Sequence, residues 1–187
     1  YSQSDANTRS LLSLAAKGDH FLIAANTFQG LLAGTLNLVV DMEGFGMRED
    51  TSDLRFIGEP RIVDGVFRYA HGYPGAYFTR YDTLRSRVLA VDGASHPVLL
   101  QMTWGKGRLV LCTAPHAFTN FNLLKNDNGT ALAAMLSALP AIPLYWHEYH
   151  NANEASGSTP LRFLLSQPSL RWAWMLTLAL TFLFILV

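Results

Sequence analysis

A run of 16 residues at the C-terminal end of the sequence, from Trp172 to Val187, contains no charged side chain. So long an apolar run forms either a membrane helix or a helix buried in a protein core. Spanning helices take about 20 residues, and tryptophans and flanking basic residues are typical of their ends. Trp172, Trp174 and Arg171 fit that pattern. We therefore predict a truncated transmembrane helix over residues 170–187 in preference to a core helix.

The composition excludes several classes of protein. Of the 187 residues, 50% are hydrophobic and 15% are charged, and 14 basic side chains balance 14 acidic ones. A disordered chain has low hydrophobicity and high net charge, and a general nucleic-acid binder has a basic excess. The single cysteine, Cys112, excludes an intramolecular disulfide. Because the sequence begins at Tyr1, we expect a fragment with one domain over 1–150 and a polar linker with an approach helix over 151–169.

The first part of the sequence reads as an α/β unit. Apolar residues at helical spacing predict a helix over Thr8–Lys17, which Gly18 ends. The apolar run Phe21–Asn26 predicts a strand that is buried on both faces. Leu31–Val40 fits a helix or a strand, and the acidic segment 41–53 reads as a loop.

The second part reads as short strands and a helix. Two apolar runs joined by Gly105-Lys106-Gly107 predict a hairpin over 97–113. A helix is expected over 128–139 with Asn128 as its N-cap, followed by a strand over 142–150. The order of elements predicts a three-layer α/β domain with an antiparallel portion.

A polar segment that directly follows a predicted buried strand is the first candidate site. It contains Asn120, Asn122, Asn126, Asp127 and Asn128. Ligand sites of α/β folds lie at the carboxyl ends of strands, and amide groups both donate and accept hydrogen bonds. These side chains therefore either bind a polar ligand or bond to their own backbone in turns and caps.

The segment Trp146-His147-Glu148-Tyr149-His150 is the second candidate. In a strand, Trp146, Glu148 and His150 share one face. Glu148 and His150 could then form an ion pair, an acid/base pair or two metal ligands. The zincin spacing is absent and two ligands do not make a metal site, so we predict no metal.

Cys112 and His116 form the third candidate. A cysteine nucleophile needs a base and an exposed turn, whereas Cys112 lies within the apolar run LVLCTA. The glycine-flanked elbow of a nucleophile is missing, and no phosphate-binding glycine loop is present. Cys112 is therefore expected to be a buried core residue.

The segments GKGRLVLCTAPHAFTNFNLLKNDN and WHEYH, followed by a polar linker and an apolar helix, resemble the bacterial domain of unknown function family 4350. The matching positions are Phe118, Thr119, Asn120, Leu123, Leu124, Asp127, Asn128, Trp146, Glu148, Tyr149 and His150. The resemblance implies a flavodoxin-like, class I glutamine-amidotransferase-like domain between two membrane helices, of which this sequence lacks the first helix and first strand. It also implies an extracytoplasmic domain at the bacterial inner membrane, near a MoxR-class AAA ATPase.

The family has no assigned reaction, and the missing elbow argues against glutaminase activity. We therefore expect a membrane-anchored, non-catalytic accessory domain of an envelope complex, which binds a partner protein or a small polar ligand without a cofactor. Its partners are membrane lipid through 170–187 and proteins, including a MoxR-class ATPase system. The candidate binding residues are Asn120, Asn122, Asp127, Asn128, Trp146, Glu148 and His150. The alternatives are a hydrolase-like enzyme using Glu148 and His150, and a structural role in which these side chains lock the fold.

Overall fold

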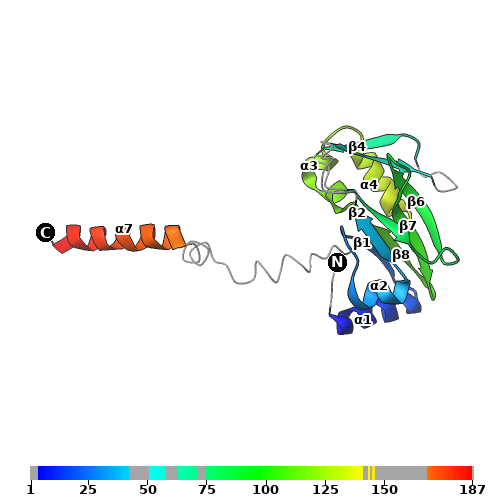
Figure 1. Cartoon of the computed structure of the whole chain (residues 1–187), viewed down its shortest axis with the longest axis horizontal. Coiled ribbons are helices and arrows are strands. Elements are labelled where there is room, and N and C mark those ends of the chain that lie inside the picture. The colour runs from blue at the N-terminus through cyan, green and yellow to red at the C-terminus, as the bar shows by residue number, and fades with distance from the viewer. Residues whose placement is uncertain are drawn as a thin grey trace. The chain divides into compact units, whose positions relative to one another are not determined.

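The computed structural model describes residues 4–42, 51–57, 63–70, 75–140, 143, 145 and 168–186. The chain divides into two compact units, Tyr1–Ala141 and Ile142–Val187. The first unit holds a β-sheet with helices, and the described part of the second unit is essentially one helix (Figure 1).

The first unit contains five helical segments and eight strands among its described residues. The helical segments are α1 (Asp5–Lys17), α2 (Gly30–Leu36), the 3-10 helix η1 (Pro115–Phe118), α3 (Asn120–Leu123) and α4 (Asn128–Ser137). The strands are β1 (His20–Ala24), β2 (Val39–Met42), β3 (Thr51–Phe56), β4 (Val66–Ala70), β5 (Ala76–Arg80), β6 (Ser86–Asp92), β7 (Pro97–Trp104) and β8 (Gly107–Cys112).

Six strands form a mixed sheet in the order β1-β8-β7-β6-β3-β4, which curves into a half-barrel (Figure 1). Only β1 and β8 run parallel, and the other neighbours are antiparallel. β2 and β5 form a separate antiparallel ribbon. The predicted flavodoxin-like, amidotransferase-like three-layer fold is therefore wrong. Such a fold needs helical crossovers between parallel strands, whereas short turns connect β6 to β7 and β7 to β8.

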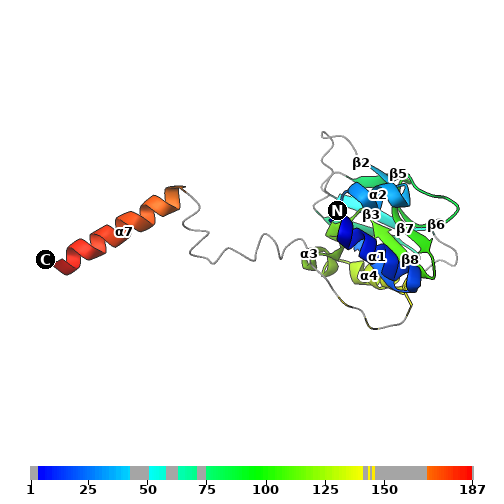
Figure 2. The ribbon, with the colours of Figure 1, turned by 90° about the horizontal axis from the view of Figure 1, so that it is seen from below.

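The core lies on both faces of this sheet. Along β8, Val110 and Cys112 pack on the face that α4 covers, and Leu109 and Leu111 pack on the face that α1 and α2 cover. All four side chains are fully buried. The helices α1, α2 and α4 that cover the sheet can be followed in Figure 2. Burial on both faces explains why β8 reads as a continuous apolar run, as the sequence predicted.

The predicted hairpin and first helix are confirmed. β7 pairs antiparallel with β8, and Trp104 faces Gly107 across the turn. Helix α1 ends at Lys17, and Gly18 follows with a φ of 128°. The turn packs closely against α1, because a Cβ on Gly107 would lie 2.4 Å from the Ala15 carbonyl oxygen.

Three local predictions are wrong. Residues 51–53 begin β3 and do not belong to a loop. β1 was predicted to be buried on both faces, but it is only half-buried. Among the described strands it is an edge strand of the sheet, because its only described neighbour is β8. The N-cap of α4 is Asp127, and Asn128 is the first residue of the helix. The Asn128 side chain is not available as a cap, because it turns inward and donates to the Arg68 carbonyl oxygen. The predicted strand over 142–150 lies outside the described residues apart from positions 143 and 145.

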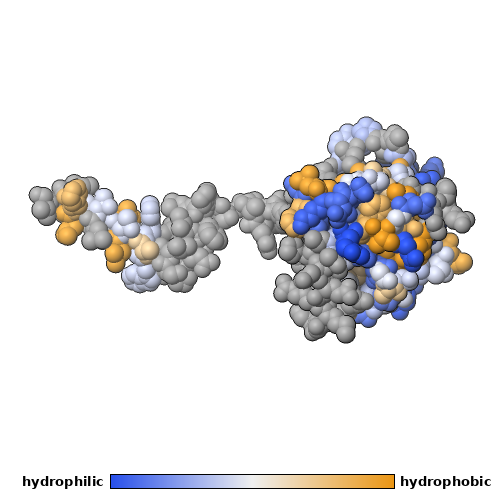
Figure 3. All heavy atoms as spheres, turned by 90° about the horizontal axis from the view of Figure 1, so that it is seen from above, coloured by the Kyte–Doolittle hydropathy of each residue, from blue (hydrophilic) through white to orange (hydrophobic). Residues whose placement is uncertain are grey.

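The described helix of the second unit is α7 (Pro168–Leu186). The large apolar side chains that the structure describes in this helix are exposed, among them Trp172, Leu176 and Phe184. Figure 3 shows orange and pale residues along its described part. Within the described residues, however, no helix is long and apolar enough to cross a membrane. This finding overturns the predicted transmembrane helix. Arg171, which was predicted to flank the span, lies inside α7 in its first turn.

Candidate functional site

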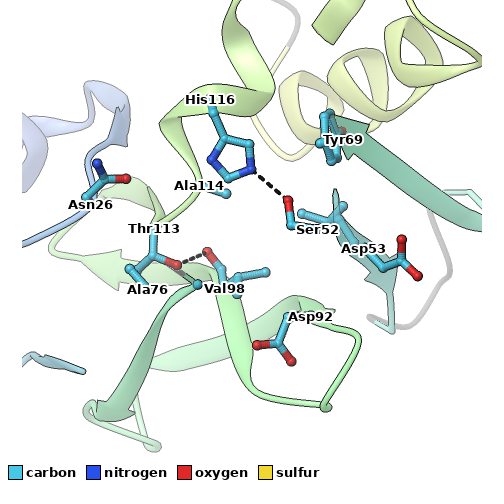
Figure 4. Close-up of a pocket in the computed structure, with 12 residues that line it drawn as sticks. Asn26, Ser52, Asp53, Tyr69, Ala76, Asp92, Val98, Thr113, Ala114 and His116 are labelled. Carbon is cyan, nitrogen blue, oxygen red and sulfur yellow. Dashed lines mark hydrogen bonds between the residues drawn. The ribbon is translucent and has the colours of Figure 1, made fainter. Parts of the chain in front are cut away.

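A cleft opens where the parallel strands β1 and β8 end. The Ala25 amide donates to the Cys112 carbonyl oxygen at 2.9 Å, which holds the two strand ends together. Asn26 lies two residues after the end of β1, and Thr113 directly follows β8. The cleft is small, with a cavity volume of about 30 Å³. The cleft is lined by Asn26, Ser52, Asp53, Leu54, Tyr69, Gly75, Ala76, Asp92, Val98, Thr113, Ala114 and His116, most of which Figure 4 labels.

The central contact of the cleft joins Ser52 to His116. Ser52 Oγ lies 3.0 Å from His116 Nε2 (Figure 4). Side chains alternate between the two faces of β3, so Ser52 lies on the same face as the buried Leu54 and Phe56. His116 comes from η1, directly after β8. A hydroxyl and an imidazole from segments far apart in the sequence therefore meet at the wall of the cleft.

Several contacts fix the position of His116. Its carbonyl oxygen accepts hydrogen bonds from Thr119 Oγ1 at 2.8 Å and from Asn122 Nδ2 at 3.1 Å. The Tyr69 ring meets the imidazole edge-on, with the ring centres 5.9 Å apart. Burial lowers the pKa of His116 below its ordinary value of 6.5. The imidazole is therefore neutral at pH 7, and one ring nitrogen can accept a proton.

Two carboxylates line the cleft, and both have partners. Asp53 accepts from Arg68 at 2.9 Å and 3.3 Å, and this hydrogen-bonded contact raises the pKa of Arg68. Asp92 accepts from the main-chain amides of Ala94 at 2.9 Å and His96 at 2.7 Å. Asp92 Oδ2 also lies 3.1 Å from His96 Nδ1. Neither carboxylate is therefore a bare negative charge.

Cys112 has no exposed surface, as the sequence predicted. Burial raises the pKa of its thiol to about 12. The thiolate is the nucleophilic form of cysteine, so this residue does not act as a nucleophile near neutral pH. Within the described part of the chain, no group of three or more His, Cys, Asp or Glu residues could hold a metal ion.

The structure separates the predicted binding residues from the cleft. Asn122 and Asn128 are buried, and Asn128 Nδ2 donates to the carbonyl oxygens of Arg68 at 3.1 Å and Asn122 at 2.9 Å. Asn120, the first residue of α3, and Asp127, which precedes α4, are both exposed. None of these four residues lines the cleft. Asn122 reaches the cleft only through its bond to His116. Trp146, Glu148 and His150 lie outside the described residues.

Sequence reasoning missed Asn26, Ser52 and Asp92. Asn26 was detectable, because it ends an apolar run of the kind whose carboxyl end carries ligand sites. Ser52 was missed because residues 41–53 were predicted to form a loop. In the structure it belongs to β3, where alternation places it on the same face as Leu54. Nothing local in the sequence marks Asp92, because it reaches the cleft through the pairing of β6 with β3, where it lies opposite Leu54.

A comparison with protein families matches residues 1–136 to the domain of unknown function DUF4350. The chain belongs to this family. The match covers the whole cleft, and the DUF4350 resemblance found in the sequence is confirmed. The membrane anchor and the amidotransferase-like character that the resemblance implied are not part of that match. The search of curated proteins finds no match to this chain.

Solved structures show only distant likeness to this DUF4350 chain. Cytoplasmic protein STM1381 from Salmonella typhimurium LT2 has 15% identity and a TM-score of 0.49, over 72% of this chain and 61% of that one. A β-galactosidase from Bacillus circulans sp. alkalophilus has 13% identity and a TM-score of 0.45, over 71% of this chain. An exo-β-1,4-mannosidase, Op5Man5, from Opitutaceae bacterium strain TAV5 has 14% identity and a TM-score of 0.45, over 72% of this chain. The chain spans 20% and 23% of these two glycosidase chains.

Proposed function

We propose that this chain is a binding domain and that the cleft at the ends of β1 and β8 takes a small polar ligand. The observation that carries the proposal is the convergence of hydrogen-bonding groups from four separate segments on one open cleft. They are the Asn26 amide, the Ser52 hydroxyl, the Asp92 carboxylate and the His116 imidazole. Such convergence is typical of a ligand site.

The charges favour a neutral or cationic ligand. Neither lysine nor arginine is among the described residues that line the cleft, and two aspartates are. The neutral His116 adds no positive charge at pH 7. Phosphate and carboxylate ligands need basic side chains or a series of main-chain amides. We therefore propose hydroxyl-bearing or amine-bearing ligands, in preference to nucleotides and organic acids.

Thermal stability tests this proposal with four simple probes. Glucose and ethanolamine represent the favoured classes, and sodium acetate and inorganic phosphate at matched ionic strength represent the disfavoured ones. Glucose or ethanolamine should raise the Tm of the wild-type chain, because a ligand of the folded state stabilises it by about 1.4 kcal/mol at ten times its Kd. Asn26→Leu should reduce that rise, and the matched surface variant Asn120→Leu should leave it unchanged. A rise caused by phosphate alone contradicts the proposal.

We also propose lipid as a partner of the chain, through the apolar side chains of α7. Those that the structure describes are exposed, including Leu176, Leu183 and Phe184. An exposed apolar surface of this kind normally marks an interaction site. A protein partner at the bacterial envelope, including a MoxR-class AAA ATPase, stays a prediction that rests on the family resemblance. Purification of the chain from bacterial membranes with its bound proteins tests it.

A further inference from the structure

The contact between Ser52 and His116 has a chemical meaning beyond ligand binding. Ser52 Oγ lies 3.0 Å from Nε2 of the imidazole, within the reach of a nucleophile and its base (Figure 4). From this geometry and the open cleft beside it, we propose that Ser52 is a nucleophile with His116 as its base and that the cleft cleaves small uncharged acyl esters. The inference rests on the proposed binding function and adds a reaction at the same cleft.

The base is held in position before any substrate binds. Three hydrogen bonds fix the His116 carbonyl oxygen, and the Tyr69 ring packs nearly perpendicular to the imidazole. Tyr69 lies directly opposite Ser52 in the pairing of β4 with β3, so one strand pair carries both the nucleophile and the residue that packs on its base. A preorganised pair loses little freedom when the reaction begins.

The protonation state suits a base. Burial keeps His116 neutral at pH 7, so the imidazole can take the hydroxyl proton. Cys112, at the end of β8, cannot compete as a nucleophile, because it is buried and its pKa is raised to about 12. Ser52, in contrast, lines the open cleft.

The proposed reaction has two balanced steps. Ser52 Oγ forms a bond to the acyl carbon while its proton passes to His116 Nε2, and the bond from that carbon to the leaving alcohol breaks as the alcohol takes the proton. Water then attacks the acyl-serine, His116 accepts the water proton and returns it to Ser52 Oγ, and a carboxylic acid leaves. An ester is the proposed substrate because an alcohol leaves more readily than an amine. The absence of basic lining residues among those described favours an uncharged ester.

A fluorophosphonate reagent tests the nucleophile, because it modifies activated serines and releases fluoride. Diisopropyl fluorophosphate should add one group to the full chain, and peptide mass spectrometry should locate it on Ser52. The modification rate should fall about 100-fold or more in Ser52→Ala and in His116→Gln. Ser137→Ala, an exposed serine of α4, should react like the wild type.

The pH dependence separates a base from a packing residue. The modification rate of the wild type should rise as the pH passes upward through the pKa of His116, and His116→Gln should lose that rise. The rate of p-nitrophenyl acetate hydrolysis should show the same rise with pH in the wild type and the same loss of that rise in His116→Gln. Circular dichroism and Tm establish that each variant is folded, and Ser52→Cys offers a second nucleophile if Ser52→Ala does not fold.

Two results overturn the inference: an unmodified Ser52 in the folded wild type, or an unchanged modification rate in folded His116→Gln. If glucose or ethanolamine still stabilises the wild type, the binding proposal survives that failure. If neither probe binds and Ser52 stays unmodified, both proposals fail.

Discussion

Asn128 is a buried amide that joins three segments. It is 1% exposed and donates to the carbonyl oxygens of Arg68 in β4 and Asn122 in α3. Asn128→Ala removes both donated bonds and leaves buried acceptors behind, so we expect the free energy of unfolding to fall by about 1–3 kcal/mol. Asn120→Ala, on the exposed face of α3, should change it by less than about 0.5 kcal/mol. Urea unfolding measures both, and equal effects would contradict this role.

His116 should make stability depend on pH. Its pKa is lower in the folded chain than the ordinary value of 6.5, so the unfolded chain binds more protons just below that pH. Its contribution is therefore complete above about pH 6.5 and is lost as the pH falls toward the folded pKa. The free energy of unfolding of the wild type should drop more between pH 7.5 and 5 than that of His116→Gln. A larger drop in the variant would reverse the sign and contradict the account.

Cys112 should be unreactive in the folded chain. With a pKa of about 12, only about one thiol in 10⁴ is ionised at pH 8, and the side chain has no exposed surface. We expect reaction with Ellman's reagent at pH 8 only as fast as the chain unfolds, and rapid reaction in concentrated urea. A fast reaction without denaturant would place the thiol at an accessible position.

At the scale of elements, the turn between β7 and β8 is constrained by its contact with α1. A Cβ on Gly107 would lie 2.1 Å from the Asp19 carbonyl oxygen and 2.4 Å from that of Ala15. Gly107→Ala must therefore move α1 away from the sheet, and we expect a loss of more than about 3 kcal/mol or failure to fold. Gly34→Ala is the matched control, because it lies in α2 with no atom within 4 Å. It should stabilise the chain by about 0.5–1 kcal/mol.

A stable Gly107→Ala chain with an unchanged Tm would show that α1 does not pack on the turn as described. Differential scanning calorimetry of the two glycine variants measures this contrast in one experiment.

The elements differ in how well the sequence predicts them, for physical reasons. The hairpin, α1 and β8 depend on local signals: continuous apolar runs, helical spacing, a glycine turn and a glycine stop at Gly18. The order of strands depends on pairing over long separations, so an apolar run such as 21–26 does not reveal that its only described neighbour is β8. For the same reason the predicted flavodoxin-like, three-layer α/β fold with an antiparallel portion was wrong.

The candidate site was harder to predict than the elements. The sequence pointed to the segment after β8, which carries both the predicted binding amides and His116; the predicted binding residues stay a prediction, and the described ones among them do not line the cleft. The clustered amides Asn122 and Asn128 bond to main-chain carbonyl groups, whereas His116 faces the cleft. Its partner Ser52 comes from β3, and a contact across 64 positions leaves no local pattern.

At the scale of the whole molecule, α7 should govern where the chain resides. Its described apolar side chains are exposed, among them Leu176 and Leu183. We expect the chain to sediment with phosphatidylcholine–phosphatidylglycerol vesicles and the double variant Leu176→Glu, Leu183→Glu to bind about tenfold less, because charges are costly in hydrocarbon. Leu84→Glu is the control, since Leu84 is 97% exposed in the first unit. Equal sedimentation of both variants would exclude α7 as the lipid contact.

The central claim is that the cleft between the ends of β1 and β8 binds small neutral or cationic polar molecules. A residue-resolved NMR titration with ethanolamine and glucose tests it most directly. The account predicts saturable shifts of the amide signals of Asn26, Ser52, Thr113 and His116, and none of these with inorganic phosphate at the same ionic strength. Shifts confined to other parts of the chain, or equal shifts with phosphate, would contradict it.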